Sequence, residues 1–136
     1  MNDEAKQPSH STALRPPGPL ESPMLNFNLD AEIEKLRAEN SWHGGRNSKT
    51  LVKYSNFRVV LIVFQRLARM EEHKTEAQIS IEVASGHVRM KAQDRVFDLP
   101  KGHILALERG MPHDVEALED SAILLTFAWP EGAHKS

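Results

Sequence analysis

Short apolar strands separated by turns fill the chain from residue 49 to residue 130, and this rhythm limits the folds that it can adopt. Turn signals recur roughly every eight to twelve residues, a spacing typical of a β-sandwich or β-barrel. Residues 78–83 alternate apolar and polar side chains, which predicts a strand with one buried face. Gly86, Gly102 and Gly110 mark turns in which a residue without a Cβ adopts positive φ easily. The sequence therefore predicts a mainly β fold.

One predicted strand, Phe57–Leu67, is apolar on both faces. Its odd-numbered face carries Phe57, Val59, Leu61 and Val63, and its even-numbered face carries Val60, Ile62 and Phe64. Such a strand is covered on both sides, so we expect a barrel core within and a helix or a partner subunit outside. The helix is predicted at Asp30–Asn40, with Asp30 as N-cap and Leu29, Ile33 and Leu36 as its apolar stripe.

The chain of 136 residues is expected to form one domain with two tails. Residues 1–23 hold five of the eight prolines and hardly any large apolar side chains, which predicts a disordered tail. Residues 24–45 are predicted to be a helix and linker, residues 46–130 the barrel domain and residues 131–136 a C-terminal tail. Met24 follows the first tail, and one hypothesis is that translation starts there instead of at Met1.

Composition excludes several classes of function. There is no cysteine, which removes disulfides, thiolate metal sites and cysteine nucleophiles. With 17 basic and 19 acidic residues and no basic block, the chain lacks the positive footprint of a nucleic-acid-binding protein. Its longest apolar run, residues 59–64, is too short to span a bilayer, and its start has no signal-peptide features. We therefore expect a cytoplasmic protein that binds neither nucleic acid nor membranes.

Two histidines are predicted to face the interior of the barrel. His113 shares strand parity with Val115 and Ala117, whereas Asp114 and Glu116 take the opposite face. His73 has the same parity as Thr75 and Ile79. Two inward histidines from distant strands of one barrel are expected to be neighbours in its mouth.

With its glycines and His113 at these positions, the strand rhythm resembles the cupin superfamily over residues 49–130, and small single-domain, RmlC-like cupins of the cupin 2 type in particular. The first motif of the family is G-x5-H-x-H-x3-4-E-x6-G. His73 and Gly86 match it, and the other positions hold Leu67, Thr75 and Ile79. The second motif is G-x5-P-x-G-x2-H-x3-N. Gly102, Gly110 and His113 match it, and the departures are Glu108 and Ala117.

The resemblance implies a single double-stranded β-helix, or jelly-roll barrel, with one N-terminal α-helix and a ligand cup. A complete cupin holds a divalent iron, manganese, nickel or zinc ion on three histidines and a glutamate. This chain keeps two of those four ligands, His73 and His113. Two imidazoles make a weak site, because catalytic metal sites generally use at least three protein ligands. His87 and His103 are further imidazoles that reach the site only if a turn bends toward it, so no cofactor is certain.

We predict that His73, Thr75, Gln78 and His113 bind the ligand at the barrel mouth and that any metal is held by His73 and His113. Gln78 stands beside the missing glutamate, although its parity points outward. For His113 a purely structural role, in which the imidazole hydrogen-bonds a backbone carbonyl, stays open.

Three classes of function stay open. The intact fold signature with a depleted ligand set favours a protein that binds or senses a small molecule. The alternative is a metal-dependent or metal-free enzyme of the dioxygenase, isomerase or epimerase type that uses His73 and His113, because histidine is the side chain best suited to act as a base near neutrality. The third is an interaction protein that only dimerises, and the resemblance implies a homodimer. Catalytic residues and the identity of the ligand are not predicted.

Overall fold

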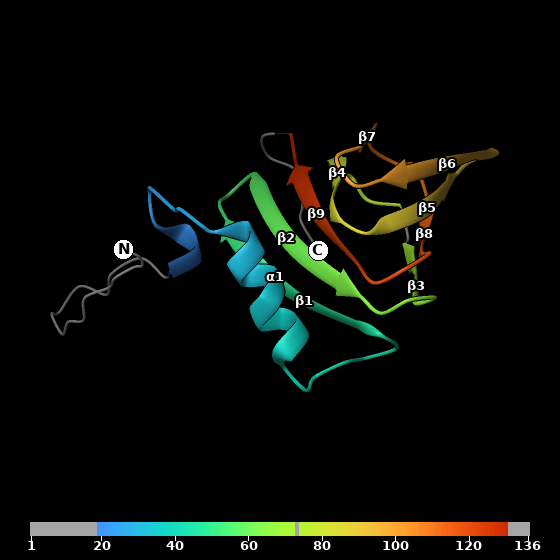
Figure 1. Ribbon diagram of the computed structural model, residues 1–136. Coiled ribbons are helices and arrows are strands. Elements are labelled where there is room, and N and C mark those ends of the chain that lie inside the picture. Colours follow the sequence, from blue (N-terminus) through green and yellow to red (C-terminus); the bar gives the residue numbers. More distant parts are fainter. Residues whose placement is uncertain (1–18, 73, 131–136) are drawn as a thin grey trace, which may run out of the picture.

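The computed structural model describes residues 19–72 and 74–130 (Figure 1). The described elements are η1 (Pro19–Glu21), α1 (Leu29–Ala38), β1 (Arg46–Lys53), β2 (Phe57–Phe64), β3 (Arg69–Glu72), β4 (Gln78–Ser85), β5 (His87–Ala92), β6 (Arg95–Pro100), β7 (Ile104–Leu107), β8 (His113–Ala117) and β9 (Ser121–Ala128). In this part of the chain no helix is long and apolar enough to cross a membrane. The predicted mainly β fold with one N-terminal α-helix is confirmed.

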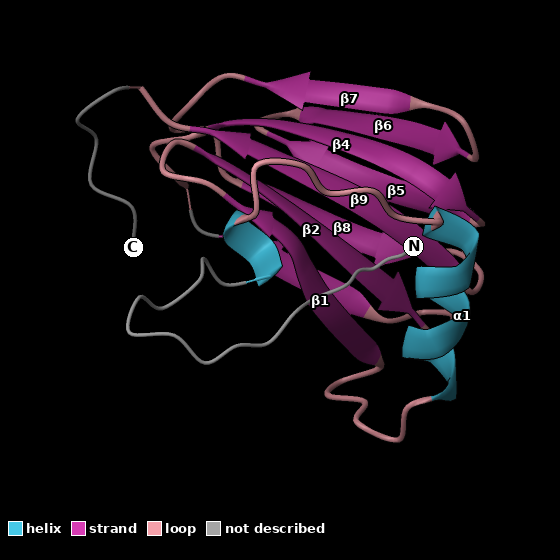
Figure 2. Cartoon of the chain, turned by 90° about the vertical axis from the view of Figure 1, so that its left-hand side faces the viewer, coloured by secondary structure: helices cyan, strands magenta, loops and turns pink. Residues whose placement is uncertain are grey.

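The strands form two antiparallel sheets that pack face to face. The five-stranded sheet has the order β1-β2-β9-β4-β7, and the four-stranded sheet has the order β3-β8-β5-β6. Their inner faces share one core, in which Ile81 and Ile123 of the first sheet and Met90 and Val115 of the second are at most 1% exposed. Each such side chain stabilises the fold by about 1.5–3 kcal/mol when it leaves water. The edge strands β6 and β7 lie side by side at one side of the barrel (Figure 2).

Strand β2 is covered on both faces, as predicted. Ile62 and Phe64 point into the core between the sheets. Leu61 and Val63 point the other way and pack in a second cluster with Ile33 and Leu36 of α1. The cover on the outer face is therefore the helix, which lies against β1 and β2 in Figure 1.

The ends of α1 differ from the prediction. The N-cap is Asn28, not Asp30, because the Asn28 side chain accepts a hydrogen bond from the backbone N–H of Ala31 at 3.1 Å. At the other end, Arg37 donates to the carbonyl oxygens of Phe64 at 3.3 Å and Ser121 at 2.7 Å. These two bonds fasten the helix to the end of β2 and the start of β9.

Two segments predicted as irregular have defined structure. Residues 71–76 were predicted as a polar loop, but the first two of them, Glu71 and Glu72, belong to β3, which pairs with β8. Only Met70 of this strand is a buried apolar side chain, so its alternation is too short to stand out. Residues 19–23 were predicted as part of a disordered tail, yet they include η1, and the Tyr54 hydroxyl donates to the Ser22 carbonyl at 2.8 Å. The predictions for residues 1–18 and 131–136 lie outside the described residues.

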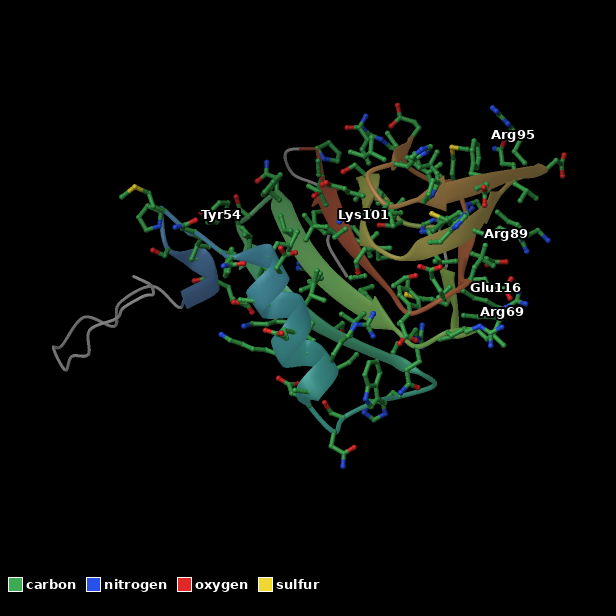
Figure 3. The ribbon with its side chains drawn as sticks, viewed as in Figure 1. Tyr54, Arg69, Arg89, Arg95, Lys101 and Glu116 are labelled. Atoms are coloured by element: carbon green, nitrogen blue, oxygen red, sulfur yellow. The ribbon has the colours of Figure 1, made fainter. Side chains whose placement is uncertain are left out.

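Charged side chains cover the outer face of the four-stranded sheet. Arg69, Glu116 and Arg89 occupy neighbouring positions on β3, β8 and β5, and Figure 3 shows them on this side of the molecule. Asp98 of β6 continues the row. Arg89 and Lys91 are exposed on this face, whereas Val88 and Met90 are buried on the other, so the candidate site is sought in the interior of the barrel.

Candidate functional site at the barrel mouth

Two loops bring the predicted site residues to one end of the barrel. Residues 74–77 lead into β4, and residues 108–112 join β7 to β8. The loops are fastened to each other because the Gly110 N–H donates to the Thr75 carbonyl at 2.8 Å. The same end holds the start of β2 and the end of β9, since Ala128 of β9 lies opposite both Gln78, the first residue of β4, and Phe57, the first residue of β2. We call this end the barrel mouth.

His113 begins β8 at the barrel mouth and faces inward, as its parity predicted. It is 3% exposed and lies opposite Ala92 of β5. Its Nδ1 is 3.1 Å from the Met111 carbonyl oxygen. A carbonyl only accepts hydrogen bonds, so Nδ1 carries the proton in this contact, and in the neutral ring Nε2 is the acceptor. No described residue hydrogen-bonds to that Nε2, which leaves a buried imidazole with one lone pair available to a ligand.

The other predicted residues are placed differently. Thr75 is partly buried, and its hydroxyl oxygen accepts the Ala77 N–H at 3.2 Å, so it shapes the loop. Gln78 lies outside the cup, because alternation along β4 turns its side chain to the exposed outer face, where it donates to Glu108 at 2.8 Å. His73 lies outside the described residues, and its role stays a prediction.

The imidazoles of His87 and His103 do not reach the mouth. His87 lies on the outer face of β5, where its Nε2 is 2.7 Å from an Asp98 carboxylate oxygen. His103 is exposed beside the turn that follows β6. The Gly86 and Gly102 turns therefore keep both rings at the opposite end of the barrel.

Gln78 instead belongs to a small polar arrangement on the mouth's rim. The Arg109 N–H at 3.0 Å and the Gln78 amide at 2.8 Å both donate to Glu108, and together with the Arg109 cation they hold the pKa of the Glu108 carboxyl below its usual range. These bonds favour the charged carboxylate, so they stabilise the folded protein at pH values above the ordinary glutamate pKa. This stabilisation is lost as the pH falls through the lowered pKa of Glu108.

We expect Gln78→Ala to raise the pKa of Glu108 toward the ordinary glutamate value, because the second-largest of these stabilising contacts is removed. A carbon-13 NMR titration of the Glu108 carboxyl measures it. Gln65→Ala, which changes an exposed glutamine elsewhere, is the control and leaves the pKa unchanged. An unchanged Glu108 pKa in Gln78→Ala contradicts this account.

The described residues do not fit a divalent metal ion. Among the described side chains of residues 19–71 and 74–130, no three from histidine, cysteine, aspartate or glutamate group closely enough to hold one. The position of the family's glutamate is taken by Ile79, an apolar residue that is 5% exposed. We therefore derive no chemistry through a metal, and ligation by His73 together with His113 stays a prediction.

An arginine that sequence reasoning missed lies on the inner face near the mouth. Arg58 shares the parity of Val60 and Ile62, which face the core. Its guanidinium carbon is 5.2 Å from the centre of the Trp129 ring, and Trp129 stacks on Phe127 at 5.7 Å. The signal was present in the sequence: a basic residue at an even position of a strand whose other even positions are all apolar.

A separate cavity of about 260 Å³ opens between the edge strands β1 and β3. It is lined by His43, Arg46, Asn47, Ser48, Ile62 and Met70. Arg46 pairs with Phe64, the last residue of β2, whereas the mouth holds the first residues of that strand. This cavity therefore lies toward the other end of the barrel.

Neither a family model nor a curated protein matches the chain. Among solved structures, a conserved protein of unknown function from Streptococcus pyogenes has a TM-score of 0.67 at 17% identity and covers 89% of this chain and 100% of its own. An RmlC-like cupin from Shewanella frigidimarina has a TM-score of 0.66 at 17% identity, with 83% and 96% covered. The Cupin 2 domain of an XRE family transcriptional regulator from Enterobacter cloacae has a TM-score of 0.58 at 17% identity, with 64% and 99% covered. The chain therefore has a cupin-type fold.

Proposed function

We propose that this protein binds or senses a small molecule that contacts His113 at the barrel mouth. The observation that supports the proposal best is the state of that imidazole. His113 is buried, its Nδ1 is committed to the Met111 carbonyl, and its Nε2 accepts no hydrogen bond from a described residue. Nε2 is not among the fully buried side-chain atoms that lack a hydrogen-bond partner, so a ligand that enters the mouth can reach it and supply a donor.

The fold and the donor set support binding more than metal catalysis. Ligand sites lie preferentially in the mouths of β-barrels. Two of the family's four ligand positions hold Thr75 and Ile79, whereas a metal enzyme generally needs three or more protein ligands. One of the similar structures is a cupin domain of a transcriptional regulator, and a sensing role for this chain is compatible with that likeness.

A metal-free enzyme is the second candidate, and the same lone pair supports it. A neutral imidazole whose Nδ1–H is fixed by a carbonyl presents Nε2 as a general base, and the fixed tautomer keeps it oriented. In this candidate, Nε2 removes a proton from a bound substrate and the Met111 carbonyl stabilises the charged ring that results. Turnover of a bound compound, which His113→Asn abolishes, distinguishes the enzyme from the sensor.

The proposal is tested by thermal-shift screening of untagged protein against a library of small metabolites. A ligand present at 100 times its Kd stabilises the fold by about 2.7 kcal/mol. His113→Asn keeps a donor near the Met111 carbonyl but lacks the Nε2 acceptor, so we expect it to weaken binding of any hit by about tenfold. His87→Asn changes a histidine on the outer face and is the matched control. Hits that bind both variants as tightly as the unmodified protein contradict the proposal.

A further inference from the structure

Arg58 has no charge partner in the part of the chain that the structure describes. The side chain is partly buried, and its Nε is fully buried without a hydrogen-bond partner. The ion pairs among the described residues join lysine, histidine or Arg109 to carboxylates elsewhere. A guanidinium in this state is costly, because a buried donor loses its bonds to water and gains none in return.

The surroundings of Arg58 hold the guanidinium in place without neutralising it. Stacking over the Trp129 ring, 5.2 Å from its centre, fixes the plane of the group and leaves its edge available for hydrogen bonds. Trp129 is 8% exposed and is backed by Phe127, so the platform itself is rigid. A preorganised and unpaired guanidinium beside aromatic rings is suited to an anion that carries an apolar body.

Arg58 and His113 belong to the same end of the barrel. Arg58 lies opposite Phe127, and Phe127 lies opposite Ile79, near the start of β4. That strand follows the loop fastened to residues 108–112, which lead directly into His113. Phe127 and Met111 also pack against one interior cluster. The cation and the imidazole thus approach the mouth from the two facing sheets.

We infer that the ligand of the barrel mouth is a small organic carboxylate, bound through its carboxylate by Arg58 and through its apolar body by the Phe127–Trp129 stack. The inference rests on the proposed function and adds the chemical class of the ligand. A carboxylate is the natural partner of a guanidinium because its two oxygens accept two parallel N–H donors. A hydrogen-bond donor for Nε2 of His113 then comes from another part of the same ligand.

The experiment uses benzoate as the probe and benzamide, its uncharged counterpart, as the comparison. Trp42 and Trp129 are the two tryptophans, so Trp42→Phe makes Trp129 the fluorescent reporter of the mouth. We expect saturable quenching by benzoate with an affinity about tenfold higher than that for benzamide, the difference that a charge-assisted hydrogen bond provides. Equal affinities for benzoate and benzamide in this protein overturn the inference by themselves.

Arg58→Met in the same background keeps an apolar stem over Trp129 and removes the charge. We expect it to bind benzoate and benzamide equally, with benzoate weakened about tenfold. Arg69→Met removes an exposed arginine from the outer face (Figure 3) and is expected to keep the preference for benzoate. A preference that survives in Arg58→Met also overturns the inference.

The outcome also separates this inference from the proposed function. Neutral metabolites that bind in a His113-dependent manner, with no preference for carboxylates, leave the proposed function intact and overturn only the role of Arg58. If neither probe nor any library compound binds at the mouth, both fail together.

Discussion

Replacing Gly86 by alanine is expected to destabilise the protein by about 2–5 kcal/mol. This cost is the sum of the left-handed backbone that a residue with a Cβ must adopt there and of the steric overlap of its Cβ with neighbouring atoms. Gly86 joins β4 to β5 with φ at +81°. A Cβ added there lies 2.3 Å from the Asp120 carbonyl oxygen and 2.7 Å from the Ser121 Cα. Because two of the nearest atoms are backbone, no side-chain rotation relieves the overlap.

The turn cannot shift away from these atoms without loss of other bonds. The Ser121 hydroxyl accepts the His87 N–H at 3.0 Å and is itself fully buried. The same hydroxyl oxygen lies 2.3 Å from the position of the added Cβ. Alanine at 86 therefore forces the β4–β5 turn away from the start of β9, where the two sheets are joined.

Gly102→Ala is the matched control for this prediction. Gly102 has φ at +91°, but nothing lies within 4 Å of an added Cβ. The control therefore carries the conformational cost alone, about 1–2 kcal/mol. Urea denaturation of both variants measures the difference, and equal losses of stability would falsify the close approach at Gly86.

Leu61→Ala is expected to cost about 2–5 kcal/mol, the range for a buried leucine truncated in a core. Leu61 is fully buried and packs between the five-stranded sheet and α1, in the cluster that holds Leu36. Its removal leaves a cavity that the helix fills only in part. The loss shows that α1 is part of the folded core and not an appendage.

The control is Phe57→Ala, on the same strand and the same face. Phe57 is 40% exposed and is the first residue of β2. Although it is the larger side chain, we expect its truncation to cost less than Leu61→Ala because much less of its surface leaves water on folding. Thermal unfolding by circular dichroism compares the two, and a larger loss in Phe57→Ala would contradict the assignment of the helix to this face.

Much of the barrel could be predicted because alternation and turn chemistry are local. Strand β4 buries one face, as the alternation of residues 78–83 predicted. His113 faces inward because Val115 and Ala117, two apolar residues of the same parity, face the core and fix the register of strand β8. The resemblance to cupins predicted the topology that joins these strands.

What sequence reasoning missed depends on contacts between distant segments. Strand β3 exists because β8 offers it a partner, not because its own residues alternate strongly. Arg58 was overlooked because its role depends on Trp129, which is far along the chain and contacts the guanidinium only in the folded protein. The orientation of Gln78 was visible in its parity, but the partner that holds it, Glu108, comes from another loop.

Several predictions are not tested by the described residues. A metal on His73 and His113, the homodimer and the cytoplasmic location stay predictions. The binding of a small molecule is the proposal on which the account of the mouth depends.

The central claim is that the Nε2 atom of His113 binds a small molecule inside the barrel. The most direct measurement is the nitrogen-15 NMR spectrum of the imidazoles, recorded before and after addition of the best compound from the metabolite screen. We predict a neutral His113 ring protonated at Nδ1 in the free protein and a ligand-dependent shift confined to its Nε2. A His113 ring protonated at Nε2 in the free protein, or an Nε2 resonance that no compound moves, would contradict the account.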